Sequence, residues 1–179
     1  MITASDGART AAAGPIAELN RTTHETIHLA TLSGDGVVYI DKVECDYPLR
    51  LHSAIGKRGP VHCTAVGKVM AAFLDPDEQR ALVGRLALTP FTAATLTTRA
   101  RLLAALADIR RAGIAFDHEE HVTGIHCAAA PVFDFRGRCI GGISMTAPRM
   151  RVDLRTLKQH AEAVRAAAHG DHDLRRWPV

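Results

Sequence analysis

The stretch IHCAAAPVFDFRGRCIGGISMT, residues 125 to 146, gives the clearest indication of the fold. Its first part, Ile125 to Asp134, is nearly all apolar, and its last part, Cys139 to Thr146, is apolar around two glycines. Between them, Phe135 to Arg138 has the composition of a turn. Strands joined by so short a turn pair antiparallel, so this stretch predicts an antiparallel hairpin.

The same pattern recurs nearer the N-terminus. Gly34-Asp35-Gly36 is a hairpin signal, because glycine adopts positive φ without steric cost, and strands are predicted on either side of it. We expect strands over residues 28–33, 37–45, 48–53 and 114–118, and a break in regular structure over residues 56–60.

Segments with apolar residues at helical spacing lie between and after these strands. It predicts helices over residues 16–26, 65–74, 76–83, 98–112 and 154–168. Thr64 and Asp75 are expected N-caps, Pro76 stands at a first helical position, and Gly113 is an expected C-terminal stop. The alternation of strand and helix groups predicts an α+β fold in which helices pack on one antiparallel sheet.

The length of 179 residues favours a single domain. Residues 1–15 are small and polar and are expected to be a flexible lead-in, residues 16–170 the folded domain, and residues 171–179 a tail.

Composition excludes several classes of protein. The net charge of +3 is well short of the basic field of a nucleic-acid-binding domain, and the arginines do not cluster. There is no signal-peptide pattern and no apolar run of membrane-spanning length. The four cysteines form no C-x-x-C pair, which favours reduced thiols in a cytoplasmic protein. No pattern in the sequence indicates a cofactor.

The loop that leads into the helix at Ala65 is a candidate binding site. The first N–H groups of a helix have no acceptor within it, so those of Ala65 and Val66 would suit a carboxylate or phosphate. An ordinary capped helix is the alternative interpretation. The segment is not a P-loop, because Gly67-Lys68 is followed by Val69.

The segment from Phe116 to Cys127 holds three carboxylates, three imidazoles and a thiol. A metal site, a nucleophile pair and a polar ligand pocket are all open interpretations. His126 and Cys127 cannot form a dyad, because neighbours in a strand point to opposite faces. Glu119 is explained by surface exposure, whereas Asp117 follows an apolar run and is expected to be half-buried.

Ser144 and Thr146 lie on one face of their predicted strand, with Met145 on the other. Two hydroxyls on a core-facing strand need partners, which a ligand or water could supply. Hydroxyls facing the surface are the alternative.

Five phrases together resemble the effector-binding domain of the IclR family of bacterial transcription regulators. They are VYIDKVE (38–44), GKRGPVHCTAVGK (56–68), GIAFDHEE (113–120), GIHCAAAPVFD (124–134) and ISMTAP (143–148). The resemblance runs from about Leu19 to Ala168, and the phrases are specific only in combination.

This resemblance implies a GAF-like domain that binds a small organic acid or aromatic metabolite, with homodimers or tetramers as the assembly. DNA would be bound only through an N-terminal winged helix-turn-helix domain outside this chain. The implied effector-binding residues are Leu49, Leu51, Ala65, Val66, Asp117, Cys127, Ser144 and Thr146. Val66 and Thr146 are larger than the residues common at their positions in the family, which should narrow the pocket.

Two other functions stay open at this point. An enzyme would use Cys127 or Asp117, but the sequence offers no clear base on the same face. A zinc-binding module would use His118, His121 or Cys127. The favoured interpretation is a sensing domain that is not an enzyme and holds no metal or cofactor.

Overall fold

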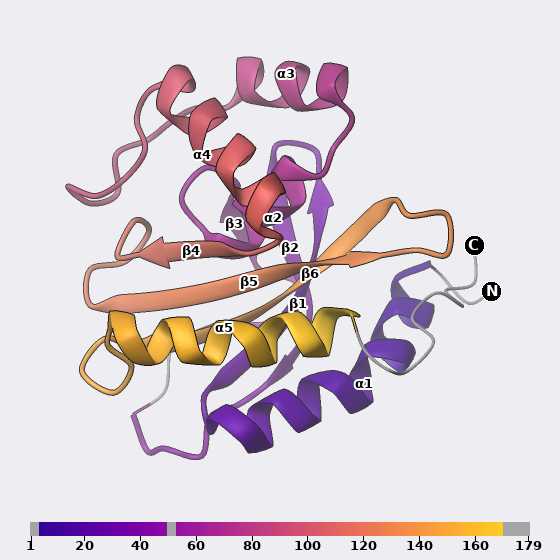
Figure 1. Cartoon of the computed structure of the whole chain (residues 1–179), viewed down its shortest axis with the longest axis vertical. Coiled ribbons are helices and arrows are strands. Elements are labelled where there is room, and N and C mark those ends of the chain that lie inside the picture. The colour runs from indigo at the N-terminus through magenta and orange to yellow at the C-terminus, as the bar shows by residue number, and fades with distance from the viewer. Residues whose placement is uncertain (1–3, 50–52, 170–179) are drawn as a thin grey trace.

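The computed structural model describes residues 4–49 and 53–169, which form one six-stranded sheet with helices on both faces (Figure 1). In chain order the elements are α1 (Ala4–Thr23), β1 (Thr26–Ser33), β2 (Gly36–Val43), β3 (Arg58–Pro60), α2 (Ala65–Ala72), α3 (Pro76–Arg85), α4 (Arg99–Ala112), β4 (Ala115–His118), β5 (Ile125–Phe133), β6 (Cys139–Pro148) and α5 (Leu154–His169). The strands lie in the order β3-β2-β1-β6-β5-β4, and each neighbouring pair is antiparallel. The predicted α+β class and the hairpin of β5 and β6 are confirmed.

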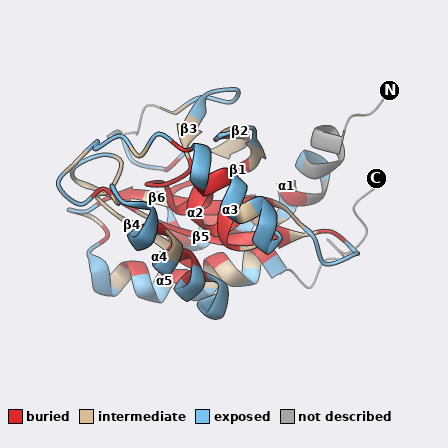
Figure 2. Ribbon diagram, turned by 90° about the horizontal axis from the view of Figure 1, so that it is seen from above, coloured by how far each residue is buried: buried red, intermediate tan, exposed pale blue. Residues whose placement is uncertain are grey.

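Two apolar cores lie on the two faces of the sheet. Helices α1 and α5 pack on one face, where Leu19 and Leu157 meet Ile143 of β6. Helices α2, α3 and α4 cover the other face, where Val69 and Leu106 are fully buried. Figure 2 shows α2 as a buried helix between the sheet and the outer helices, whose far sides are exposed. Burial on both sides explains why β5 and β6 are almost continuously apolar.

The first helix is longer than its sequence suggested. Helix α1 begins at Ala4 rather than Ile16, so most of the segment expected to be a flexible lead-in is helical. Ala12 and Ile16 are buried in the core shared with α5, and this packing offsets the backbone hydrogen bond that Pro15 removes. The division of the chain into residues 1–15, 16–170 and 171–179 remains a prediction.

The third strand lies later in the chain than predicted. Residues 46–49, which include the first two residues of the expected strand 48–53, form bends. Residues 50–52 of that strand are outside the described part. Strand β3 instead uses Arg58–Pro60, where a break was expected, and pairs with the beginning of β2. It lies at the edge of the sheet, where a proline without an N–H can be accommodated.

The predicted helix ends are mostly confirmed. Thr64 caps α2 by accepting a hydrogen bond from the Gly67 N–H at 3.1 Å, and Gly113 ends α4 with a left-handed φ of 68°. Pro76 is the first residue of α3, as predicted, but the Asp75 side chain makes no capping hydrogen bond.

Candidate functional site

Neighbouring strands bring residues that are far apart in the sequence into adjacent rows. Asp117 of β4 lies opposite Cys127 of β5, which lies opposite Thr146 of β6. In the next row, Ser144 of β6 lies opposite His28 of β1. Ser144 and Thr146 share the face toward α2, while the methionine between them joins the core beside α1 and α5, so the predicted alternation is confirmed.

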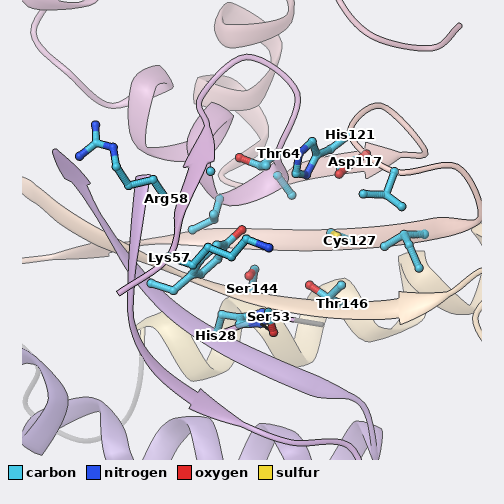
Figure 3. A pocket seen from close by; sticks show the side chains of 16 residues that line it. His28, Ser53, Lys57, Arg58, Thr64, Asp117, His121, Cys127, Ser144 and Thr146 are labelled. Carbon is cyan, nitrogen blue, oxygen red and sulfur yellow. Dashed lines mark hydrogen bonds between the residues drawn. The ribbon is translucent and has the colours of Figure 1, made fainter. Parts of the chain in front are cut away.

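These side chains form the floor of a cavity of about 300 Å³ between the sheet and the beginning of α2 (Figure 3). Its wall has polar and apolar parts. The lining residues are His28, Tyr39, Ser53, Lys57, Arg58, Gly59, Thr64, Ala65, Val66, Asp117, His121, Val122, Ile125, Cys127, Ser144 and Thr146. A concave, mainly apolar site with a few converging polar groups is the usual form of a small-molecule site.

Six of the eight residues predicted to bind an effector line this cavity. They are Ala65, Val66, Asp117, Cys127, Ser144 and Thr146. Leu49 does not line it and is 59% exposed, and Leu51 lies outside the described residues. The fold therefore unites the helix start, the β4–β5 region and the last strand, whereas contact with an effector stays a prediction.

Asp117 is buried more completely than the sequence suggested, with an exposed fraction of 2%. Burial raises the pKa of its carboxyl group to about 7, and the nearby Glu120 carboxylate adds to the rise. The Glu120 N–H donates to Asp117 Oδ1 at 2.7 Å, and this bond and the Lys68 ammonium group partly oppose the rise. Near neutral pH, Asp117 can thus present either a hydrogen-bond acceptor or a donor to a ligand.

Cys127 is a protonated thiol rather than a nucleophile. Burial raises its pKa well above the ordinary value, and the neighbouring Asp117 carboxylate raises it further. His126 points away from the cavity and hydrogen-bonds the Val152 carbonyl through Nδ1 at 2.8 Å, so the two side chains form no dyad, as predicted. The geometry gives no support to a cysteine-dependent enzyme.

A buried ion pair holds the loop beside Asp117. Lys68 of α2 is 3% exposed and its ammonium group contacts the Glu120 carboxylate. The hydroxyls of Thr92 and Thr95 each donate at 2.6 Å, to the carbonyls of Glu119 and Glu120 respectively. These contacts fix the segment after β4 against α2 and the α3–α4 connection, so the Asp117 wall of the cavity is rigidly supported.

The beginning of α2 faces the cavity with unused donors. Thr64 accepts from the Gly67 N–H, and no hydrogen bond is donated by the N–H groups of Ala65 and Val66 within the described residues. The Val66 side chain lies against β6, where a Cβ on Gly142 would come within 2.8 Å of Val66 Cγ2. The absence of a side chain at Gly142 therefore lets the helix start approach the sheet and narrows the cavity there.

The opposite wall contains residues that the sequence did not indicate. His28, Tyr39 and Ser53 line the cavity, and His28 Nε2 lies 2.8 Å from Ser53 Oγ. Burial, together with the positive charge of Lys42, lowers the pKa of His28 to about 4, so its imidazole is neutral at pH 7. Its Nδ1 is buried without a hydrogen-bond partner in the described part of the chain.

The histidines expected for a zinc site are separated by the sheet. His121 lines the cavity and packs edge-on against Phe91 at 5.0 Å between ring centroids. His118 lies on the face of the sheet away from Cys127, with its ring centroid 5.8 Å from that of His126. Among residues 4–49 and 53–169 there is no cluster of three or more potential ligands able to hold a metal ion.

Comparison with known proteins accounts for this arrangement. The family model for the C-terminal region of the bacterial transcriptional regulator IclR matches residues 3–170. The chain belongs to the IclR family. This is a family of regulators and not of enzymes, as the sequence predicted, and its effector-binding domains bind small molecules.

Two regulators of Escherichia coli (strain K12) are similar to the chain. KdgR is 39% identical over 151 residues, or 84% of the chain, and XynR is 41% identical over 159 residues, or 89% of the chain. The matches cover 57% of KdgR and 63% of XynR, so the chain spans less than two thirds of the length of these relatives.

Solved structures of the family confirm the GAF-like fold. The C-terminal domain of E. coli KdgR superimposes with a TM-score of 0.83 at 34% identity, covering 94% of this chain and 98% of that one. The inducer-binding domain of an Acinetobacter PobR double mutant, in complex with 3-hydroxybenzoic acid, gives a TM-score of 0.82 at 25% identity, covering 91% and 94%. None of the helices in the described part of this chain has the length and apolar character needed to cross a membrane.

Proposed function

We propose that this effector-binding domain senses a small organic acid or aromatic carboxylate in the cavity between α2 and the sheet. The observation that carries the proposal is the convergence of polar groups on one mainly apolar cavity of about 300 Å³. The free N–H groups of Ala65 and Val66 suit a carboxylate, and Asp117, Ser144 and Thr146 suit a hydroxyl or carbonyl elsewhere on the ligand. The complex of PobR with a hydroxybenzoic acid supports this class of ligand.

We further propose how the domain acts. Effector binding would change operator binding by a winged helix-turn-helix domain outside this chain, in a cytoplasmic regulator assembled as a homodimer or tetramer. The greater length of KdgR and XynR is consistent with such a second domain. Measuring operator affinity of a full-length regulator containing this domain, with and without the acid, tests this part.

A panel of small carboxylates tests the ligand class directly. Any acid that binds only the folded domain stabilises it by mass action, by about 2.7 kcal/mol at a hundred times its dissociation constant. We expect at least one acid to raise Tm by several degrees in a thermal scan. A broad panel that shifts nothing, with a cooperative melting curve as proof of folding, would refute the proposal.

The variant Asp117→Ala should lose this response while remaining folded. The alanine removes the polar group that faces the cavity from β4 but leaves the ion pair of Lys68 with Glu120. We expect a normal far-UV circular dichroism spectrum and at least a tenfold weaker affinity, because a hydrogen bond to a charged partner contributes about 1.5–3 kcal/mol. Asp108→Ala, on the exposed side of α4, is the control and should bind like the unmodified protein. Unchanged affinity in Asp117→Ala would show that Asp117 does not contact the effector.

A further inference from the structure

The charged groups around the cavity differ in whether they have partners. Lys68 is paired with Glu120. Arg58 donates to the Ser33 carbonyl at 2.7 Å and contacts Asp35, and its guanidinium group points away from the cavity (Figure 3). Lys57 lines the cavity, and its ammonium group makes no ion pair or hydrogen bond within the described residues. Among the residues that the structure describes, Lys57 is therefore the cation at this site that is available to a ligand.

Lys57 is an exposed residue at the open side of the cavity, and it forms part of the cavity lining. In the view of Figure 3 the side chain extends from the β3 side toward the residues that line the sheet. The charge of Lys57 acts on His121, which also lines the cavity. Burial first, and then the charges of His62 and Lys57, lower the pKa of His121. The ammonium group thus contributes positive potential across the cavity, with Asp117 on the wall beside His121.

The backbone that carries Lys57 is held firmly. The Tyr39 N–H donates to the Lys57 carbonyl at 3.2 Å, and the Gly56 N–H donates to the Tyr39 carbonyl at 2.8 Å. The Lys57 N–H donates to the Ala54 carbonyl at 3.1 Å, in a tight bend that Gly56 permits with a φ of 83°. The bend therefore fixes the point at the rim of the cavity from which the Lys57 side chain extends.

An unpaired cation at the rim of an apolar cavity attracts an anion. The free N–H groups of Ala65 and Val66 add positive potential at the wall formed by α2. We propose that Lys57 is a specificity-determining residue that pairs with the carboxylate of the effector at the open side of the cavity, so that the domain selects acids over the corresponding amides. This inference rests on the proposed function of the cavity.

The pairing also orients the ligand. A carboxylate held by Lys57 leaves the other end of the molecule to face Asp117, Ser144 and Thr146. Those groups are matched by an uncharged hydroxyl or carbonyl and not by a second carboxylate, because a second negative charge would repel the Asp117 carboxylate. The expected effector is a monocarboxylic acid with a hydroxyl or keto group away from the acid.

Matched pairs of acids and amides test the assignment. The probes are 3-hydroxybenzoate, lactate and pyruvate, each with its own amide, and dissociation constants are measured by calorimetry for the unmodified domain and for Lys57→Met, Lys57→Arg and Lys158→Met. We expect the unmodified domain to prefer the acid that binds best over its amide. Lys57→Met should weaken that acid about tenfold and leave the amide unchanged, because one charge-assisted bond is lost from a partly exposed pair. Lys57→Arg should retain most of the preference.

The control variant and the stability of the ligand-free domain separate the possible outcomes. Lys158 lies on the exposed side of α5, so Lys158→Met makes the same chemical change away from the cavity and should alter nothing. Lys57→Met should melt within a few degrees of the unmodified domain, because the lysine side chain has no partner among the described residues. An acid preference that persists in Lys57→Met, or equal weakening of acid and amide, would overturn the role of Lys57 and leave the proposed function intact. If none of the three acids binds the unmodified domain, the pairing fails together with the proposed function for these acids.

Discussion

Replacing Gly67 by alanine should lower the free energy of unfolding by about 3 kcal/mol, among the largest effects of a single added methyl group in this domain. A Cβ on Gly67 would lie 2.6 Å from both the Cα and the carbonyl oxygen of Val61 and 2.7 Å from Thr64 Oγ1. Two of these atoms belong to the backbone, so no side-chain rotation relieves the clash. Because every residue of α2 is buried, the helix can move away only by disturbing its packing against β5, β6 and α4.

Gly84→Ala is the matched control, since Gly84 also lies within a helix. A Cβ there meets no atom within 4 Å. Alanine has a higher helix propensity than glycine, so this variant should be more stable by about 0.5–1 kcal/mol. Urea unfolding followed by circular dichroism measures both changes. Equal stability of Gly67→Ala and the unmodified domain would mean that α2 is free to shift, and the cavity beside it would then have no fixed shape.

The floor of the cavity could be predicted from the sequence because it depends on strand alternation. Asp117, Cys127, Ser144 and Thr146 lie in strands whose hydrophobic pattern sets which face each side chain occupies. Alternation alone also excludes the pairing of His126 with Cys127, because neighbours in a strand point to opposite faces. The start of α2 was predictable for a similar reason, because Thr64 is a strong capping residue before a helical pattern.

The wall of the cavity that contains Tyr39 and Lys57 could not be predicted, because it depends on a register shift between β1 and β2 and on a long loop. The pairing of β1 with β2 shifts register between Leu29 and Ala30, so that Ala30 lies opposite Tyr39. This bulge turns Tyr39 toward the cavity and Ile40 toward the core beside α1 and α5. Lys57 reaches the site only because β3 forms at residues that resemble a break. In each case tertiary contacts overrode the local pattern.

Replacing Asp117 by asparagine should stabilise the domain at neutral pH, on the order of 3 kcal/mol. The folded-state pKa of Asp117 is about 7, above the value near 4 of an unfolded aspartate, so between these pH values the folded protein holds a proton that the unfolded chain has released. The stability that this proton contributes is complete below about pH 4 and is lost as pH rises to about 7. Asparagine keeps the acceptor for the Glu120 N–H and carries no charge, so it avoids this loss.

The difference between Asp117→Asn and the unmodified domain should therefore grow from about pH 4 to pH 7 and stay constant above that. Urea unfolding at several pH values across this range measures it. Glu119→Gln is a control for which the stability difference should change with pH in the opposite direction. The pKa of Glu119 is lowered first by the hydrogen bond from the Gly124 N–H at 2.5 Å and then by Arg149. The stability that the ionised Glu119 carboxylate contributes is therefore present at neutral pH and is lost as pH falls. Parallel pH profiles for Asp117→Asn and the unmodified domain would show that Asp117 stays ionised when folded.

The same proton bears on effector recognition. An acid effector brings a negative charge into a cavity where Asp117 is 2% exposed, and two carboxylates in such a site do not both remain charged without cost. Protonated Asp117 removes the repulsion and gains a donor for the hydroxyl or keto group of the ligand. Affinity of the unmodified domain for an acid should therefore fall as pH rises above 7, whereas that of Asp117→Asn should not change over the same range. An affinity of the unmodified domain that stays constant over this range would mean that the effector carboxylate is screened from Asp117, as it would be if Lys57 alone set the charge balance of the site.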